Sequence, residues 1–117
     1  MAGKSKYVLT VCMDVDADKE ALFNEVYDSE HIPLISKVQG VLAVRRYRNV
    51  PLTMTIGGEA KTIVMADEPR YMAVYELESP DVLTGAGWAK AVDAGRWASE
   101  VRPYTRNRRH VLRELIG

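Results

Sequence analysis

Residues 7–14, YVLTVCMD, are the segment that most constrains the fold of this chain. Apolar side chains occur at both parities of the segment, whereas a strand with one face in water alternates apolar and polar residues. The pattern predicts a strand that is buried on both faces, so its sheet must be covered on each side. Cys12 is the chain's only cysteine and has no disulfide partner within the chain. We expect it to be a small core side chain.

Composition excludes several classes of protein. The chain has 117 residues, of which 47% are hydrophobic and 27% charged, so we expect a single folded domain over residues 1–117 rather than a disordered chain. Sixteen basic residues balance sixteen acidic ones, so no overall field attracts nucleic acid or a membrane surface. No apolar run is long enough to cross a membrane, and no apolar segment follows the N-terminal lysines, so we expect a cytoplasmic protein.

Helices and strands alternate along the rest of the chain. Residues 19–31 carry a helical stripe of apolar positions after the N-cap oxygens of Asp16 and Asp18. Ser79 begins a second helical region, which its glycines divide into two short pieces that meet at an angle. Three further segments have the composition or alternation of strands, namely residues 41–48, 70–78 and 103–112.

Residues 49–69 interrupt this order. Two short β-prone pieces, 53–56 and 61–65, flank Gly57 and Gly58, a pair suited to the positive φ angles of a tight turn. The segment is predicted to be a hairpin insertion.

The order strand, helix, strand, insertion, strand, helix, strand predicts an α+β protein with the ferredoxin-like arrangement. In that arrangement two helices cover one side of a four-stranded antiparallel sheet. Since residues 7–14 are apolar on both faces, something else must cover the second side. A second copy of the chain is the simplest candidate, so we predict a homodimer.

The stretch 23–33, FNEVYDSEHIP, is the sharpest chemical feature of the sequence. Phe23, Tyr27 and His31 recur every four residues and form one ridge of a helix. Pro33 should end the regular helix directly after His31, because it lacks an N–H and restricts the residue before it. The carboxylates at positions 28 and 30 could orient the imidazole or raise its pKa. The alternative is a helix-end histidine with a satisfied hydrogen bond and no chemical role.

Several segments together resemble a known group of proteins. They are the stretch FNEVYDSEHIPLISKVQGVLAVRRYR, the later YMAVYELESPDVL, the pair Trp88 and Ala91, and RPYTRNRR near the C-terminus. The chain is similar to the dimeric α/β-barrel superfamily, and within it to the EthD-like group of small bacterial proteins. The resemblance implies a ferredoxin-like subunit that dimerises into an α/β barrel and holds a small organic molecule between sheet and helices. Members include cofactor-free monooxygenases, cyclases, isomerases and haem enzymes, and the fold does not choose among them.

The leading hypothesis is a cofactor-free enzyme that performs acid/base chemistry on a small hydrophobic or aromatic metabolite, as a cyclase, isomerase or dehydratase does. His31 would be the general acid/base with Tyr27 beside it, and Arg45 could steady the resulting enolate or carboxylate. Substrate-binding candidates are Phe23, Arg45, Tyr47, Tyr75, Trp88, Trp97 and Asn107. The aromatic side chains among them could equally be core.

Two other functions stay open. One is a non-catalytic module that binds a small molecule for a catabolic or biosynthetic pathway, and the other is a haem-dependent or cofactor-free oxygenase. We expect no metal and no cofactor, because the two histidines form no HExxH motif, no CxxC pair occurs and no glycine-rich phosphate loop follows a strand. The arginine-rich last strand, beside Tyr104, superficially suggests RNA binding. Zero net charge favours salt bridges within the protein instead.

Overall fold

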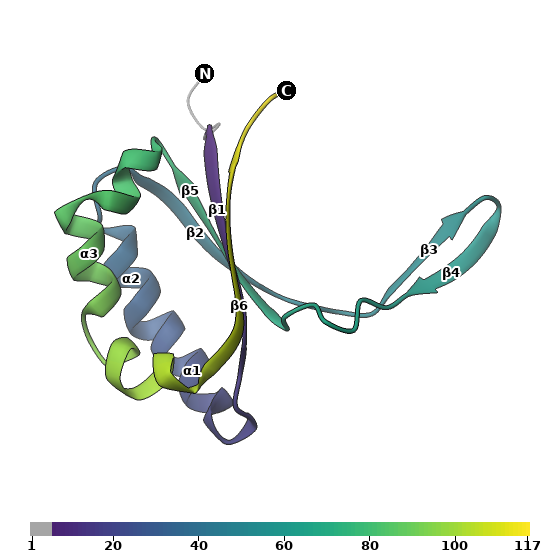
Figure 1. The fold of residues 1–117 in the computed structure, drawn as a ribbon, viewed down its shortest axis with the longest axis horizontal. Helices are drawn as coiled ribbons and strands as arrows, with labels where there is room; N and C mark the ends of the chain where they lie inside the picture. The colour runs from purple at the N-terminus through teal and green to yellow at the C-terminus, as the bar shows by residue number, and fades with distance from the viewer. Residues whose placement is uncertain (1–5) are drawn as a thin grey trace.

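The computed structural model describes residues 6–117 and contains a four-stranded antiparallel sheet with helices on one face and a hairpin arm beyond the other (Figure 1). The sheet has the strand order β2-β5-β1-β6, which is the ferredoxin-like order. The predicted fold is therefore confirmed. Its strands are β1 (Tyr7–Val15), β2 (Val41–Arg48), β5 (Tyr71–Leu77) and β6 (Thr105–Glu114), and the arm consists of β3 (Leu52–Ile56) and β4 (Glu59–Ile63).

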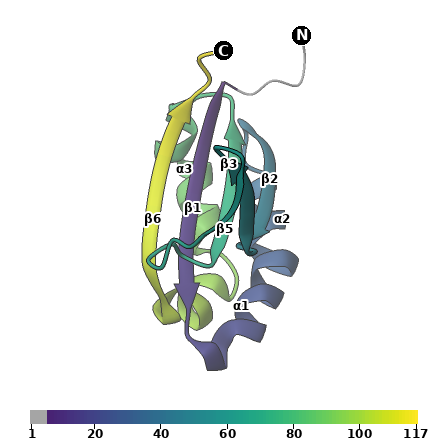
Figure 2. The same ribbon diagram turned by 90° about the vertical axis from the view of Figure 1, so that its right-hand side faces the viewer.

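The two faces of the sheet consist of alternate residues of the same strands. The face toward the helices, called the inner face below, buries every second side chain of β1 and β5, beginning with Leu9 and Tyr71. The register places Leu9 opposite Tyr75 and Val11 opposite Ala73. The outer face carries the intervening residues and has no layer over it within residues 6–117 (Figures 1 and 2). Cys12 lies there, half-buried, so its prediction as a core residue is wrong.

The sequence predicted that the regular helix ends directly after His31, but the first helical segment continues beyond it. It runs from α1 (Glu20–Val26) through a π-helical turn (Tyr27–His31) into α2 (Ile32–Ser36). Within the π turn, the N–H of Ile32 bonds to the carbonyl of Tyr27, five residues back. Pro33 is accommodated because it stands in the first turn of α2, where a missing N–H costs no hydrogen bond of that helix.

The second helical region is divided, as predicted. A 3₁₀ turn (Pro80–Thr84), capped by the Ser79 side chain, precedes α3 (Ala86–Asp93). Gly95, with a φ of 69°, then redirects the chain into a second π turn (Trp97–Val101). Helix α3 carries Trp88 and the second π turn carries Trp97, so the two side chains lie at different points over the sheet.

The last strand begins later than predicted, at Thr105, because Arg102–Tyr104 form a 3₁₀ turn. Its pairing with β1 shifts register between Cys12 and Asp14, and Asn107 has a φ of 52° at this irregularity. The extra residue is a β-bulge, which re-aims the side chains on either side of it.

The predicted hairpin insertion forms the arm and projects from the body (Figures 1 and 2). The described chain extends over 50 × 43 × 19 Å with a radius of gyration of 16.1 Å. A compact chain of this length has a radius of gyration of roughly 13 Å, so the arm accounts for the excess. Within the described residues, no helix has the length and apolar character needed to cross a membrane.

Candidate functional site

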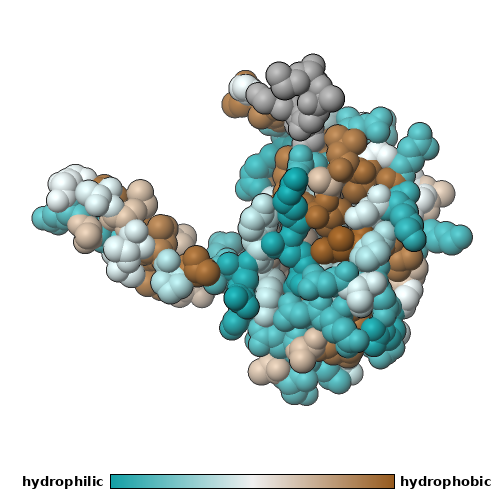
Figure 3. Space-filling model, turned by 180° about the vertical axis from the view of Figure 1, so that it is seen from behind, coloured by the Kyte–Doolittle hydropathy of each residue, from teal (hydrophilic) through white to brown (hydrophobic). Residues whose placement is uncertain are grey.

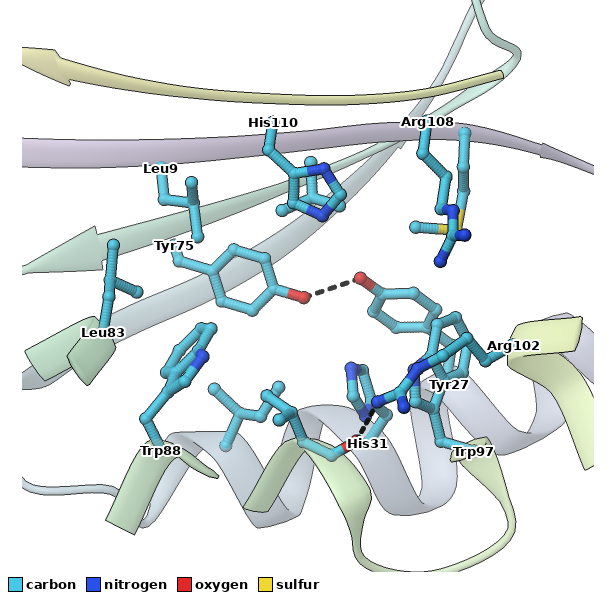
Figure 4. A pocket seen from close by; sticks show the side chains of 14 residues that line it. Leu9, Tyr27, His31, Tyr75, Leu83, Trp88, Trp97, Arg102, Arg108 and His110 are labelled. Carbon is cyan, nitrogen blue, oxygen red and sulfur yellow. Dashed lines mark hydrogen bonds between the residues drawn. The ribbon is translucent and has the colours of Figure 1, made fainter. Parts of the chain in front are cut away.

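A cavity of about 400 Å³ lies between the inner face and the helices (Figure 4). Its floor comes from β1, β5 and β6, and its other walls come from the first π turn, α2, α3 and the segment that follows Gly95. The volume falls within the range of small-molecule sites, which is roughly 300–1,000 Å³. Because most of the lining is apolar, the few polar groups on it determine what the cavity can do.

His31 is one of the buried polar groups, with 4% of its surface exposed. Its ring stacks on Trp97, with the ring centroids 4.4 Å apart and the planes 22° from parallel. Its Nδ1 atom has no hydrogen-bond partner among the described residues. Burial, and secondarily the positive charge of Arg102, lowers the pKa of His31 to about 4. The imidazole is therefore neutral at physiological pH and has a nitrogen atom to offer.

The carboxylates near His31 in sequence do not reach it. Glu30 accepts hydrogen bonds from the backbone N–H of Arg96 at 3.0 Å and from its Nε at 2.5 Å. Asp28 accepts one from Arg46 at 2.8 Å. The prediction that a neighbouring carboxylate orients the ring or raises its pKa is therefore wrong, and the pKa shift has the opposite sign.

Tyr27 and Tyr75 form a buried pair of hydroxyl groups, 2.6 Å apart, at the cavity wall (Figure 4). Burial raises the pKa of Tyr75 to about 12 and that of Tyr27 well above its ordinary value, so both stay protonated. Two hydroxyl groups share this one bond, and it uses only one of their two protons. Neither hydroxyl has another partner within residues 6–117, so one proton is available to a ligand. The ring of Tyr27 meets that of His31 edge-on at 5.0 Å, which brings the donor and the imidazole together.

Both tryptophans of the chain line the cavity. Trp88 meets Tyr75 edge-on at 5.6 Å, and Trp97 meets Tyr27 at 5.0 Å. Flat aromatic walls of this kind suit planar, mostly apolar molecules. The tryptophan fluorescence of the protein should therefore report on what occupies the cavity.

Of the residues predicted from the sequence, the structure brings together His31, Tyr27, Tyr75, Trp88 and Trp97. Four other predicted residues lie outside this cavity: Phe23, Arg45, Tyr47 and Asn107.

Strand parity explains the positions of two of them. Arg46 pairs opposite the buried Ala73, so it belongs to the inner face and its neighbours Arg45 and Tyr47 belong to the outer face. Arg45 forms an ion pair there with Glu76.

Phe23 and Asn107 lie elsewhere for different reasons. Phe23 is packed behind Tyr27 and Trp97, with 1% of its surface exposed. Asn107 stands at the bulge of β6, where its side-chain amide donates to Asp14 Oδ2 and to the carbonyl of Asp67, each at 3.1 Å.

Three polar cavity residues are not among those predicted from the sequence, namely Arg102, Arg108 and His110. The signal was present, because Arg108 and His110 share a parity on the last strand, but the strand was interpreted as a salt-bridging surface. Arg102 precedes that strand, in the short 3₁₀ turn. Among the described residues, no cluster of three or more His, Cys, Asp or Glu side chains could hold a metal ion.

Neither a protein-family model nor a curated protein matches this sequence. Solved structures do match it. MhuD, a haem degrader from Mycobacterium tuberculosis solved with two haems bound in its active site, is 16% identical, with a TM-score of 0.61 over 94% of this chain and 95% of that chain. A variant of MhuD with two manganese protoporphyrin IX molecules bound per active site is 16% identical, with a TM-score of 0.63 over 94% of each chain. An EthD family protein from Bacillus halodurans is 14% identical, with a TM-score of 0.57 over 94% of this chain and 99% of that chain.

At this level of identity the likeness concerns the fold. The chain shares its ferredoxin-like fold with MhuD and with the EthD family protein, which confirms the fold and the resemblance predicted from the sequence.

Proposed function

We propose that this protein is an enzyme that binds a small hydrophobic or aromatic metabolite in the cavity and performs acid/base chemistry on it without a cofactor. The observation that carries the proposal is the neutral, buried imidazole of His31, which lies beside a cavity of about 400 Å³ and whose Nδ1 has no partner within residues 6–117. A polar atom buried without a partner costs stability, and such atoms are rare unless a ligand uses them.

In the proposed reaction His31 acts as the general base and accepts a proton from a carbon atom next to a carbonyl or carboxylate of the substrate. The spare hydroxyl proton of the Tyr27–Tyr75 pair donates to the oxygen atom on which negative charge develops. A pKa of about 4 makes His31 a weak base in the free protein. An anionic oxygen nearby would favour the imidazolium ion and raise that pKa as the proton is transferred.

Proton abstraction can be tested without knowing the natural substrate. Indanone, a flat bicyclic ketone, is incubated with the protein in D₂O, and exchange at its acidic carbon is followed by NMR. We expect the wild type to accelerate exchange and His31→Gln to lose roughly a hundredfold or more of that acceleration. Arg109→Gln, on the outer face of β6, serves as the matched control and should retain it. Equal exchange by wild type and His31→Gln would overturn the proposal.

A non-catalytic binder is the first alternative function. A collapsed interior with His31 bonded only to backbone would favour it, but the interior is open and His31 Nδ1 bonds to nothing in residues 6–117. Tight binding of a ligand with no exchange or turnover would nevertheless identify a binder.

Haem is the second alternative: the chemistry of the polar residues suits it, although a porphyrin is larger than the roughly one dozen groups that the cavity of about 400 Å³ holds. A neutral, unpartnered imidazole such as that of His31 is a ligand type that haem iron accepts, and Arg102 and Arg108 could pair with the propionates. Bound haem would supply oxygen chemistry at the iron. A Soret band that appears on titration with hemin and shifts in His31→Gln would support this alternative, and the absence of such a band would remove it.

The predicted homodimer is proposed to form through the outer face. The centre of that face is apolar and only half-buried, at positions Val8, Cys12, Met72 and Val74. The arm extends on the same side and exposes Leu52, Met54 and Ile56 along one of its faces (Figures 1 and 3). An isolated two-stranded hairpin is marginally stable in water, so a partner subunit would stabilise the arm.

The dimer is tested by light scattering after size exclusion. The wild type should have the mass of two chains rather than the 13.1 kDa of one. Met54→Glu should dissociate it, whereas Thr55→Glu, on the opposite face of the arm, should do so less. A monomeric wild type at micromolar concentration would overturn this part of the proposal.

A further inference from the structure

Arg108 differs from the other arginines of β6 because it has no hydrogen bond or ion pair to any described residue. The others each have a partner: Arg106 bonds to Asp16 at 2.6 Å, Arg109 to the carbonyl of Asp67 at 2.9 Å, and Arg113 to Thr10 Oγ1 at 3.1 Å. Arg108 also faces the cavity, whereas Arg109 and Arg113 pair opposite residues on the outer face. The bulge at Asn107 separates it from Arg106.

Arg102 adds a second guanidinium group at the same end of the cavity (Figure 4). Its Nη2 atom donates to the carbonyl of Val92 at 2.7 Å and lies 2.9 Å from Asp93 Oδ1. These contacts hold the side chain in place, and its other nitrogen atoms have no partner in residues 6–117. Among the described residues, no aspartate or glutamate lines the cavity. Asp93, which lies outside the lining, pairs with Arg102, so Arg108 is the guanidinium group that no carboxylate offsets.

The opposite end of the cavity is apolar. Figure 4 places Leu83 and Trp88 there, away from Arg102 and Arg108. A ligand that satisfies both ends needs an apolar, flat body and an anionic head. At about 30 Å³ for each water-sized group, the cavity of about 400 Å³ holds roughly a dozen such groups.

We propose that the cavity takes a one- or two-ring aromatic carboxylate, with its rings at the Trp88 end and its carboxylate between Arg102 and Arg108. Arginine matches this head group because its planar fork of N–H donors binds a carboxylate through two parallel bonds. The proposal rests on the proposed function, since it names the substrate class of that same site. It makes Arg108 a specificity-determining residue, the one that separates the acid from its neutral analogues.

The test uses two probes of the same shape, naphthoate and naphthamide, with binding followed by calorimetry and by quenching of Trp88 and Trp97 fluorescence. Naphthoate should bind more tightly than naphthamide by about tenfold or more, because hydrogen bonds to charged groups are the stronger kind. Arg108→Gln should remove most of that preference and leave the affinity for naphthamide nearly unchanged. Arg109→Gln, the neighbour that points to the outer face, is the matched control and should keep the preference.

Three results would overturn the proposal: no binding of naphthoate, equal affinity for the two probes, or an equal loss of preference in Arg108→Gln and Arg109→Gln. His31→Gln separates this inference from the proposed function, because it should still bind naphthoate through Arg108 while losing proton exchange on indanone. Preference for the acid without any proton exchange would support the carboxylate site and contradict the enzyme. Proton exchange without preference for the acid would support the enzyme and contradict the carboxylate site.

Discussion

The outer face of the sheet and the cavity side of the inner face come from the same strands but differ in whether their charged groups have partners within the protein. On the outer face the arginines are matched within the protein, as Arg45 is by Glu76 and Arg109 by Glu68. Around the cavity, the Arg108 guanidinium on the inner face and His31 Nδ1 on the helical layer opposite it have no partner among the described residues.

This difference separates structural charges from functional ones. A polar group matched by its neighbours has little left to offer a ligand, whereas an unmatched group beside the cavity can bind one. Only the buried one, His31 Nδ1, also costs stability until something binds there, because Arg108 is exposed to water. The arginine-rich composition of β6 is thus a poor guide by itself, and the direction of each side chain decides its role.

The largest expected effect comes from the core of the inner side. Phe23→Ala should lower the free energy of unfolding by about 3–5 kcal/mol, because Phe23 is fully buried and its loss leaves a cavity. Tyr47→Ala, on the outer face, should cost about 1 kcal/mol or less. Urea unfolding at two protein concentrations measures both and separates any contribution from association. Equal losses would mean that the two faces are buried alike.

The second effect is the pH dependence that His31 confers. Its pKa is about 4 in the folded protein and near 6.5 in the unfolded chain, so between these values the unfolded state binds more protons. Stability should therefore fall as pH falls from about 6.5 to about 4, by about 3 kcal/mol in all.

Urea unfolding at a series of pH values tests this expectation. His31→Gln should flatten the dependence over that window, whereas His110→Gln, which leaves the buried imidazole in place, should not. A slope that persists unchanged in His31→Gln would show that other groups carry it.

Much of the fold follows from the sequence because its signals are local. Parity in residues 7–14 and 70–78, the Ser79 cap and the Gly57–Gly58 pair each act within a few residues and each gave the correct element. The helix stop at Pro33 failed because the π turn before it is not a local preference of these residues. Such turns depend on packing against the sheet, which a sequence pattern does not contain.

The candidate site was predictable only in part, for a related reason. The spacing of Tyr27 and His31 placed both on one helix face, and that face does meet the sheet. To place Arg45 and Tyr47 on the outer face and Arg46 on the inner face, one must know the register of β2 against β5, because a shift of one residue exchanges the two faces. The role of Arg108 required the partners of every other arginine on β6, which only the folded chain reveals.

The third effect compares a buried hydroxyl pair with an exposed one. Tyr75→Phe removes the partner of the Tyr27 hydroxyl in a buried site and should cost about 1–2 kcal/mol. Thr53→Val breaks the pair of threonine hydroxyls in the arm, which lie 2.9 Å apart in an exposed site, and should cost about 0.5 kcal/mol or less. Thermal or urea unfolding distinguishes them, and a larger loss from the arm would contradict the ranking.

The smallest effect sharpens the contrast between matched and unmatched arginines. Arg45→Gln removes an exposed ion pair with Glu76 and should cost about 0.5 kcal/mol at low salt and less at high salt, where the pair is screened. Arg108→Gln breaks no bond within the described residues, so its effect on the free energy of unfolding should be near zero at any salt concentration, even though it removes the preference for naphthoate. Urea unfolding at low and high salt measures both. A clear, salt-dependent loss of stability in Arg108→Gln would mean that this arginine already has a partner within the protein in solution and is not free to bind a ligand.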